Sequence, residues 1–127
     1  DNKLIDIAKK EDRIIVSKDK NLITKSAKIG IRSVLITKNA EIEQFCELIN
    51  HLNLPILQIN GDTARCTKCN STTELVNKMT IKEKIPYKTY ELNDRFWQCN
   101  SCNQIYWEGI HIKNLQKFVN QLNERFQ

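Results

Sequence analysis

The fold of the N-terminal half is decided by residues 13–36, which read RIIVSKDKNLITKSAKIGIRSVLI. Two short, almost continuous apolar runs rich in branched residues, 13–16 and 33–36, are typical of buried strands. The stretch between them predicts a helix that begins near Asn21 and stops at Gly30, a residue that commonly ends helices. A strand–helix–strand unit of this kind places its two strands parallel in one sheet. The segment therefore predicts an α/β fold.

Helices are predicted on both sides of this unit. Asp1 can cap a first helix whose apolar residues form one stripe, and residues 40–52 form a second helix with Pro55 beyond its end. Two parallel strands do not make a stable sheet by themselves, so we expect at least one further strand before Asp1. Residues 1–60 are accordingly predicted to form an α/β lobe that is incomplete at its N-terminus.

The sequence changes character after residue 60, where short strand-like runs, turns and cysteine pairs replace the long periodic helices. A last helix is predicted from about Ile112, because apolar residues recur there at helical spacing. These residues are Leu115, Phe118, Val119, Leu122 and Phe126. We therefore expect a second domain over residues 61–127, which ends in an amphipathic helix.

Charge and composition narrow the class of partner. The 127 residues carry a formal net charge of +5, and residues 1–38 hold ten basic against five acidic side chains. A basic excess favours an anionic partner, most often nucleic acid, although an ordinary solvated surface is the alternative. No stretch approaches the roughly 18 apolar residues that a membrane span requires, and no secretory signal opens the sequence. We expect a soluble intracellular protein without a membrane partner.

Four of the five cysteines form two Cys-x-x-Cys pairs, Cys66 with Cys69 and Cys99 with Cys102. Each pair can form a tight turn that points two thiolates at one ion, and two such turns complete a tetrahedral zinc site. Four thiolates leave no position for water, so the zinc is predicted to be structural. The alternatives are a redox pair or disulfides. Both are disfavoured, because the sequence has two matched pairs and no secretory signal.

The fifth cysteine and the two histidines are not predicted to be ligands. Cys46 lies on the apolar face of the helix at 40–52, and we expect it to pack in the core. His51 and His111 lack ligand-like spacing to the cysteines and are interpreted as structural or solvated.

Longer stretches of the chain resemble the C-terminal domain of the mut-seven/Nibbler family. They are DNKLIDIAKKEDR at 1–13, IIVSKDKNLI at 14–23, EQ at 43–44, RCTKCN at 65–70 and FWQCNSCNQIYWEGIH at 96–111. The last stretch resembles the eukaryotic members, which are 3′–5′ exoribonucleases in RNA silencing. The resemblance implies a PIN-like ribonuclease fold with a parallel sheet, followed by a zinc ribbon and a C-terminal helix. It also implies that the exonuclease catalytic domain lies elsewhere, upstream in the parent protein.

The resemblance also implies candidate catalytic residues. PIN-like nucleases cluster acidic residues at strand ends, where they hold a divalent metal that activates water. Asp1 falls at one such acidic position, and Asp19, in Ser17-Lys18-Asp19, falls at another. Mg²⁺ or Mn²⁺ would be their cofactor. Without the family, Asp19 is a turn residue that caps the helix beginning near Asn21.

Two further acidic positions of the family pattern are not matched. The acidic residue of the first strand is not in this sequence. Near the last acidic position stand Asn39 and Ala40, and Glu41 is the nearest substitute. The resemblance therefore leaves an incomplete acidic cluster.

Two functions remain open. The first is an RNA-binding or partner-docking accessory domain of a 3′–5′ exoribonuclease in small-RNA processing or silencing, which is not catalytic by itself. Its partners would be single-stranded RNA and a protein of the silencing machinery, in the cytoplasm or nucleus. Basic side chains are its candidate phosphate contacts. We expect Lys18, Lys20, Lys25 and Lys28 to surround the turn after the strand at 13–16, and Arg65, Lys68 and Lys113 to extend that surface.

The aromatic residues beside the second cysteine pair have two interpretations. Trp97, Tyr106 and Trp107 either stack on unpaired bases or form the core between the zinc ribbon and the last helix.

The second open function is a metal-dependent PIN-like ribonuclease that uses Asp1 and Asp19. Because the acidic set is incomplete, we expect this chain alone not to cleave RNA.

Overall fold

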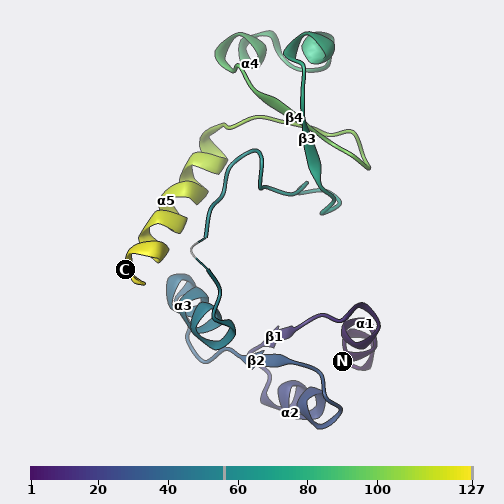
Figure 1. Ribbon diagram of the computed structural model, residues 1–127, viewed down its shortest axis with the longest axis vertical. Helices are drawn as coiled ribbons and strands as arrows, with labels where there is room; N and C mark the ends of the chain where they lie inside the picture. The colour runs from purple at the N-terminus through teal and green to yellow at the C-terminus, as the bar shows by residue number, and fades with distance from the viewer. Residues whose placement is uncertain (56, 127) are drawn as a thin grey trace. The chain divides into compact units, whose positions relative to one another are not determined.

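The computed structural model describes residues 1–55 and 57–126, and the chain divides into two compact units, residues 1–55 and 56–127 (Figure 1). The first unit contains a two-stranded parallel sheet, and the second a three-stranded antiparallel sheet. Helices accompany both sheets, which confirms the predicted mixture of helices and strands. None of the helices in the described residues has the length and apolar character that a membrane crossing requires.

The first unit follows the predicted order of elements. These are α1 (Asn2–Glu11), β1 (Ile15–Ser17), α2 (Lys20–Lys28), β2 (Ser33–Leu35) and α3 (Glu41–Leu52). Strands β1 and β2 pair in parallel, as predicted, with Ile15 opposite Ser33 and Ser17 opposite Leu35. Because both strands run the same way, the loops that follow them lie at one edge of the sheet.

The core of the first unit lies between the first two helices and β1. Its buried residues come from α1, β1, α2 and the loop before β2: Ile5, Ala8, Ile15, Leu22 and Ile31. Ile5 and Ala8 of the apolar stripe predicted after Asp1 therefore face the strand, whereas Leu4 and Ile7 of that stripe are 47% and 41% exposed. Figure 1 shows α3 on the other side of the two strands from α1, and Ile49 is its buried residue.

The second unit is built on a sheet of order β3–β4–β5. Its elements are β3 (Thr73–Val76), η1 (a 3₁₀ helix, Lys78–Lys84), α4 (Tyr87–Leu92), β4 (Phe96–Cys99), β5 (Ile105–Tyr106) and α5 (Ile110–Glu124). Thr73 lies opposite Cys99 at one end of the β3–β4 pair, and Val76 lies opposite Phe96 at the other. The cysteine turns and the η1–α4 segment therefore occupy opposite ends of this pair.

The η1–α4 segment is a helical insertion that the sequence analysis did not predict. Both helices are shorter than the stretch over which apolar periodicity can be recognised. The insertion buries Ile81, which is 1% exposed, against Phe96 and Ile105. Tyr90 stacks on Phe96, and the Lys78 ammonium lies 4.5 Å from the centre of the Tyr90 ring.

Helix α5 holds the start of the second unit through side-chain amides. The Asn123 side chain accepts a hydrogen bond from the Leu57 backbone amide over 3.2 Å and donates to the Leu57 carbonyl over 2.8 Å. Gln116 donates to the Ile59 carbonyl over 3.1 Å. Leu122 is fully buried on the same helix. The extended segment that leads to the cysteine turns is thereby fixed without belonging to a strand.

The Trp97 indole lies directly on the backbone of Gly61. Trp97 is 1% exposed, and its Nε1 donates to the Asp62 carboxylate over 2.9 Å. Arg95 donates to the other oxygen of Asp62 over 2.9 Å and lies 5.0 Å from the centre of the Trp97 ring. A Cβ at Gly61 would overlap the indole, so no other residue fits there without movement of the ring.

We predict that Gly61→Ala lowers the free energy of unfolding by about 1–3 kcal/mol, the usual cost of overpacking a core. Urea unfolding of the two proteins measures the difference. Gly109→Ala is the control, because its added Cβ would lie 3.3 Å from Trp107 Nε1, a tight contact without overlap. Equal losses for the two variants would contradict the placement of Trp97 on Gly61.

Candidate functional site

The first cysteine turn contains Cys66 and Cys69 and precedes β3. The Asn70 amide donates to the Cys66 carbonyl over 2.8 Å, and the Cys66 amide donates to the Ser71 carbonyl over 3.0 Å. Asn70 has a φ of 62°, in the left-handed region that asparagine tolerates better than most residues. This geometry closes the turn and directs both cysteine side chains to the same side.

The second cysteine turn repeats this design. The Asn103 amide donates to the Cys99 carbonyl over 3.2 Å, and the Cys99 amide donates to the Gln104 carbonyl over 2.9 Å. Asn103 has a φ of 64°. Both turns thus have the pattern Cys-x-x-Cys-Asn. Sequence reasoning found the cysteines and missed the asparagines, although their shared position was a usable signal.

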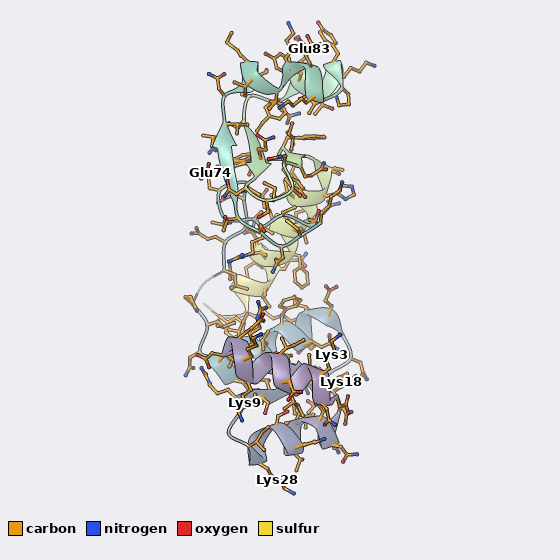
Figure 2. All side chains as sticks on the ribbon, turned by 90° about the vertical axis from the view of Figure 1, so that its right-hand side faces the viewer. Lys3, Lys9, Lys18, Lys28, Glu74 and Glu83 are labelled. Carbon is orange, nitrogen blue, oxygen red and sulfur yellow. The ribbon has the colours of Figure 1, made fainter. Side chains whose placement is uncertain are left out.

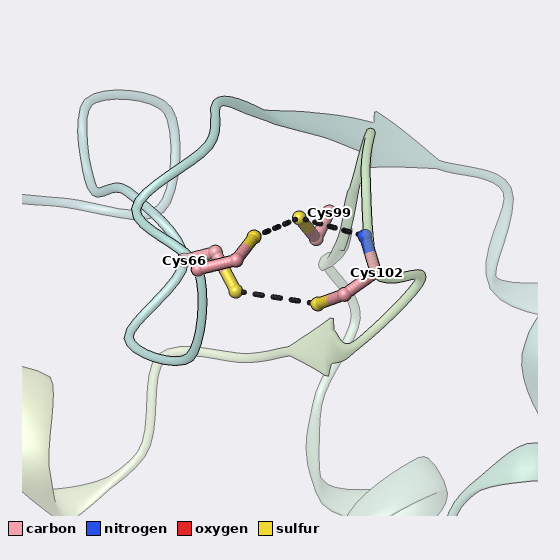
Figure 3. A group of neighbouring side chains, drawn as sticks. Cys66, Cys99 and Cys102 are labelled. Atoms are coloured by element: carbon pink, nitrogen blue, oxygen red, sulfur yellow. Dashed lines mark hydrogen bonds between the residues drawn. The ribbon is translucent and has the colours of Figure 1, made fainter.

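The four cysteine sulfurs come together, as the spacing predicts (Figure 3). Cys66 Sγ lies 3.5 Å from Cys102 Sγ, Cys69 Sγ lies 3.4 Å from Cys99 Sγ, and all four lie within 4.8 Å of one another. Zinc–sulfur bonds of about 2.3 Å in a tetrahedron put the sulfurs about 3.8 Å apart. The four thiols therefore fit a metal ion of this size and coordination.

Tyr106 of β5 contacts this cysteine group. Its hydroxyl lies 3.0 Å from Cys66 Sγ and accepts a hydrogen bond from the Thr67 amide over 3.1 Å. The hydrogen bond from Tyr106 lowers the pKa of the Cys66 thiol to about 6. Burial raises the pKa of Tyr106, so the phenol keeps the proton that it donates. The thiolate, the form that binds metal, is favoured at Cys66.

The remaining cysteine and the histidines lie outside this group. Cys46 was predicted to pack in the core, but it is only half-buried on α3. The reason is that α3 covers the sheet with only part of its apolar face, where Ile49 is buried. His51 and His111 do not join the cysteines within the described residues, as expected.

Asp19 lies at the edge where β1 ends and acts as the N-cap of α2. Its Oδ1 accepts hydrogen bonds from the backbone amides of Asn21 and Leu22, over 2.9 and 3.2 Å. The Asp19 amide itself donates to Ser17 Oγ over 3.0 Å. The capping interpretation of Asp19 is confirmed, since a cap satisfies amides that the helix leaves free.

The other acidic candidates do not join Asp19 in a metal-binding group. Asp1 is the exposed N-cap residue of α1 and makes no capping hydrogen bond through its side chain. Glu41 is exposed in the first turn of α3. Within residues 1–55 and 57–126, the four cysteines are the one group of three or more metal-ligating side chains.

Asn39 has a contact of a different kind at this edge. Its Oδ1 accepts a hydrogen bond from Lys18 Nζ, which joins the loops after β1 and β2. The strand-end edge therefore presents a lysine held by an asparagine beside the capping Asp19.

Glu47 on α3 shapes the loop after β2, and sequence reasoning missed it. Its carboxylate accepts hydrogen bonds from the Thr37 amide at 3.0 Å, the Thr37 hydroxyl at 2.7 Å and the Lys38 amide at 2.7 Å. Burial raises the pKa of Glu47, but the hydrogen bonds from Thr37 and Lys38 outweigh it and bring the pKa below its ordinary value. Nothing in the residues nearest to Glu47 in sequence indicates these partners.

We predict that Glu47→Gln destabilises the protein at neutral pH and has little effect in acid. The folded-state pKa lies below the unfolded value of about 4.3, so the carboxylate stabilises the fold above that pH. Its contribution disappears as the pH falls through the folded-state pKa. Thermal unfolding between about pH 7 and pH 3 should show the difference in Tm closing. A constant difference would argue against the charge-dependent network.

The lysines predicted to contact phosphate are not one cluster. Lys18 and Lys20 flank Asp19, but Lys28 is the last residue of α2, about 12 Å from Lys20 along the helix axis. Figure 2 shows Lys18 and Lys28 apart from each other on the first unit. Lys25 donates to Asn2 Oδ1. The expectation that all four surround the strand-end turn is corrected, because the length of α2 carries Lys28 to the other end.

The basic and aromatic candidates of the second unit lie near the first cysteine turn and in the sheet. Arg65 donates to the Asn70 carbonyl over 3.0 Å, and Lys68 is exposed within the turn. Lys113 is exposed on α5. Trp97 is buried, which favours its interpretation as core. Trp107 packs edge-on against Phe96 and is half-buried, as is Tyr106.

Comparison with known proteins places this arrangement in a family. The model of the Mut7-C RNAse domain matches residues 1–119, which include both parallel strands and both cysteine pairs. Neither the search of curated proteins nor the search of solved structures gave a match. The match covers most of the 127 residues, and it ties the chain to ribonucleases. The chain therefore belongs to the Mut7-C RNAse domain family.

Proposed function

We propose that this chain is an RNA-binding accessory module of a 3′–5′ exoribonuclease of the mut-seven/Nibbler type. It would act inside the cell, in small-RNA processing or silencing, beside proteins of that machinery, and would not cut RNA by itself. One observation carries the proposal. The Asp19 carboxylate is engaged by the amides of Asn21 and Leu22, while Lys18 and Lys20 stand on either side of it. This edge suits a phosphate better than a divalent cation.

The lysines at the edge differ in how they are held. Lys18 is oriented by Asn39, so less side-chain freedom is lost when its ammonium meets a phosphate. Lys20 is exposed in the first turn of α2. Lysine–phosphate contacts release counterions, so affinity that depends on them falls as salt rises. The proposal therefore makes RNA binding salt-dependent through these two residues.

We predict that Lys18→Glu with Lys20→Glu weakens binding of single-stranded RNA and flattens its salt dependence. Each lost phosphate contact should reduce the slope of log affinity against log salt by about 0.7. Fluorescence anisotropy of a labelled oligoribonucleotide measures both quantities. Lys84→Glu with Lys88→Glu changes the net charge equally on the η1–α4 insertion, and should leave the slope nearly unchanged. Equal effects of the two double variants would count against the strand-end edge as the RNA contact.

The cysteine group would hold structural zinc in a zinc ribbon. Zinc is favoured because four thiolates at tetrahedral spacing are its typical closed site, which offers no place for a substrate. The ion would join the two turns and stabilise a unit whose last strand, β5, has two residues. The first unit would be the PIN-like part, with residues 1–60 and 61–127 as the two domains.

We predict about one zinc ion per chain in protein purified without chelator, and loss of that zinc in Cys69→Ser. Elemental analysis gives the content, and circular dichroism before and after chelation shows whether the second unit unfolds. Cys46→Ser, which removes a thiol outside the group, should keep its zinc. Zinc-free wild-type protein with an intact fold would overturn this part of the proposal.

A second candidate function is a metal-dependent ribonuclease, because the matching family is described as an RNAse domain. Asp1 and Asp19 would then bind Mg²⁺ or Mn²⁺, which would activate water and neutralise the phosphate. For this function Asp19 would have to serve the helix cap and the cation at once.

Cleavage of labelled single-stranded RNA in Mg²⁺ or Mn²⁺ separates the two functions, and we predict no cleavage. Asp19→Asn is the informative variant, because asparagine caps helices about as well as aspartate and so preserves α2. Cleavage by the wild type that is lost in Asp19→Asn, with unchanged thermal stability, would establish the nuclease and refute the accessory role.

A further inference from the structure

The second unit contains a cavity of about 600 Å³ beside the cysteine turns. Its walls come from the segment before β3, from β4 and β5, and from the first turns of α5. The half-buried residues Tyr106 and Trp107 are among its lining residues, as are Ile112 and Leu115. Cavities of this size and mostly apolar character are typical of ligand sites.

Two polar side chains line this apolar cavity without a partner. The half-buried Gln104 amide and the solvent-exposed His111 imidazole make no hydrogen bond or ion pair within residues 1–55 and 57–126. An amide offers both donors and an acceptor, the combination that the edge of a nucleobase requires. The cavity thus has an aromatic residue, Tyr106, and a side-chain amide without a partner, Gln104, among its lining residues.

The rim of the cavity is suited to an anion. Helix α5 begins there at Gly109, which has no side chain to cap it, and its first turn contains no acidic residue. The first amides of a helix have no intrahelical partner and favour negative charge. Arg65 and the exposed His111 also line the cavity, and Arg65 donates to the Asn70 carbonyl over 3.0 Å. No Asp or Glu is found among its described lining residues, and the nearby Glu108 carboxylate is engaged by the Gly61 amide over 3.0 Å.

We propose that this cavity binds one unpaired nucleotide of single-stranded RNA. The base would lie against Tyr106 with its edge near Gln104, and its phosphate would lie at the start of α5 beside Arg65. This inference rests on the proposed RNA-binding function and names the part of the RNA that is recognised. An apolar side chain of a partner protein would fill the walls but would leave the positive rim and the Gln104 amide unused.

The test compares two probes that carry the same number of phosphates. One is a short oligouridylate, and the other is the same ribose–phosphate chain without bases. The zinc-loaded protein should bind the oligouridylate about tenfold more tightly, since each stacked base contributes to affinity independently of sequence. Because both probes have equal charge, the ratio of their affinities removes the contribution of phosphate contacts.

Leu115→Glu should abolish this preference. Leu115 lines the cavity and is 50% exposed, so the substitution adds a charge to the wall without emptying a core. Leu92→Glu is the matched control, because Leu92 is 82% exposed on α4 and does not line the cavity. Gln104→Ala tests the base edge without any change of charge and should also reduce the preference.

The outcomes separate this inference from the proposed function. Base preference in the wild type and in Leu92→Glu, lost in Leu115→Glu, supports the nucleotide site. Equal binding of both probes by the wild type overturns the site but leaves RNA binding through phosphates intact. Failure of the wild type to bind either probe overturns both proposals. Preference that persists in Leu115→Glu and Gln104→Ala places the base elsewhere and overturns the cavity.

Discussion

The approach of four cysteine sulfurs to within 4.8 Å of one another is the contact on which the second unit depends. It joins a turn before β3 to a turn after β4, and these turns are brought together by the pairing of Thr73 with Cys99. Short strands bury little apolar surface, so the proposed zinc ion would substitute for core that the unit lacks. Tyr106 extends this group into β5 through its hydroxyl.

Trp97 links the cysteine end of the sheet to the segment before it. Its ring packs on Gly61, and its Nε1 donates a hydrogen bond to Asp62. The same residue lines the cavity, which therefore has one rigid wall. The cysteine group and the proposed nucleotide site thus lie on the same sheet. Bound zinc would fix the two turns, and the nucleotide would use the surface between these turns and α5.

The sequence was sufficient for the features that depend on local pattern. Residues 13–36 predicted the parallel strands, and the Cys-x-x-Cys spacing predicted the four-thiol group, because both rest on periodicity or spacing. Features that depend on distant partners were missed. Glu47 meets Thr37 only when α3 folds back on the loop after β2, and η1–α4 is too short to show a period.

The candidate site residues also show which features the sequence predicts and which it does not. Asp19 was predicted to cap the helix from its position between a strand and Asn21, and the cap is confirmed. The lysines on α2 were grouped by closeness in sequence, and the rise of the helix separated Lys28 from Lys20. The cavity combines residues that are far apart in the sequence, so no single motif indicates it.

Amide hydrogen exchange of the zinc-loaded protein, with and without single-stranded RNA, tests most directly that this chain is an RNA-binding module. The account predicts RNA-dependent protection in the loop after β1, around Lys18, and around Gln104 and the start of α5. It predicts no change in the η1–α4 insertion. Exchange that is identical with and without an excess of single-stranded RNA throughout the described residues would contradict it.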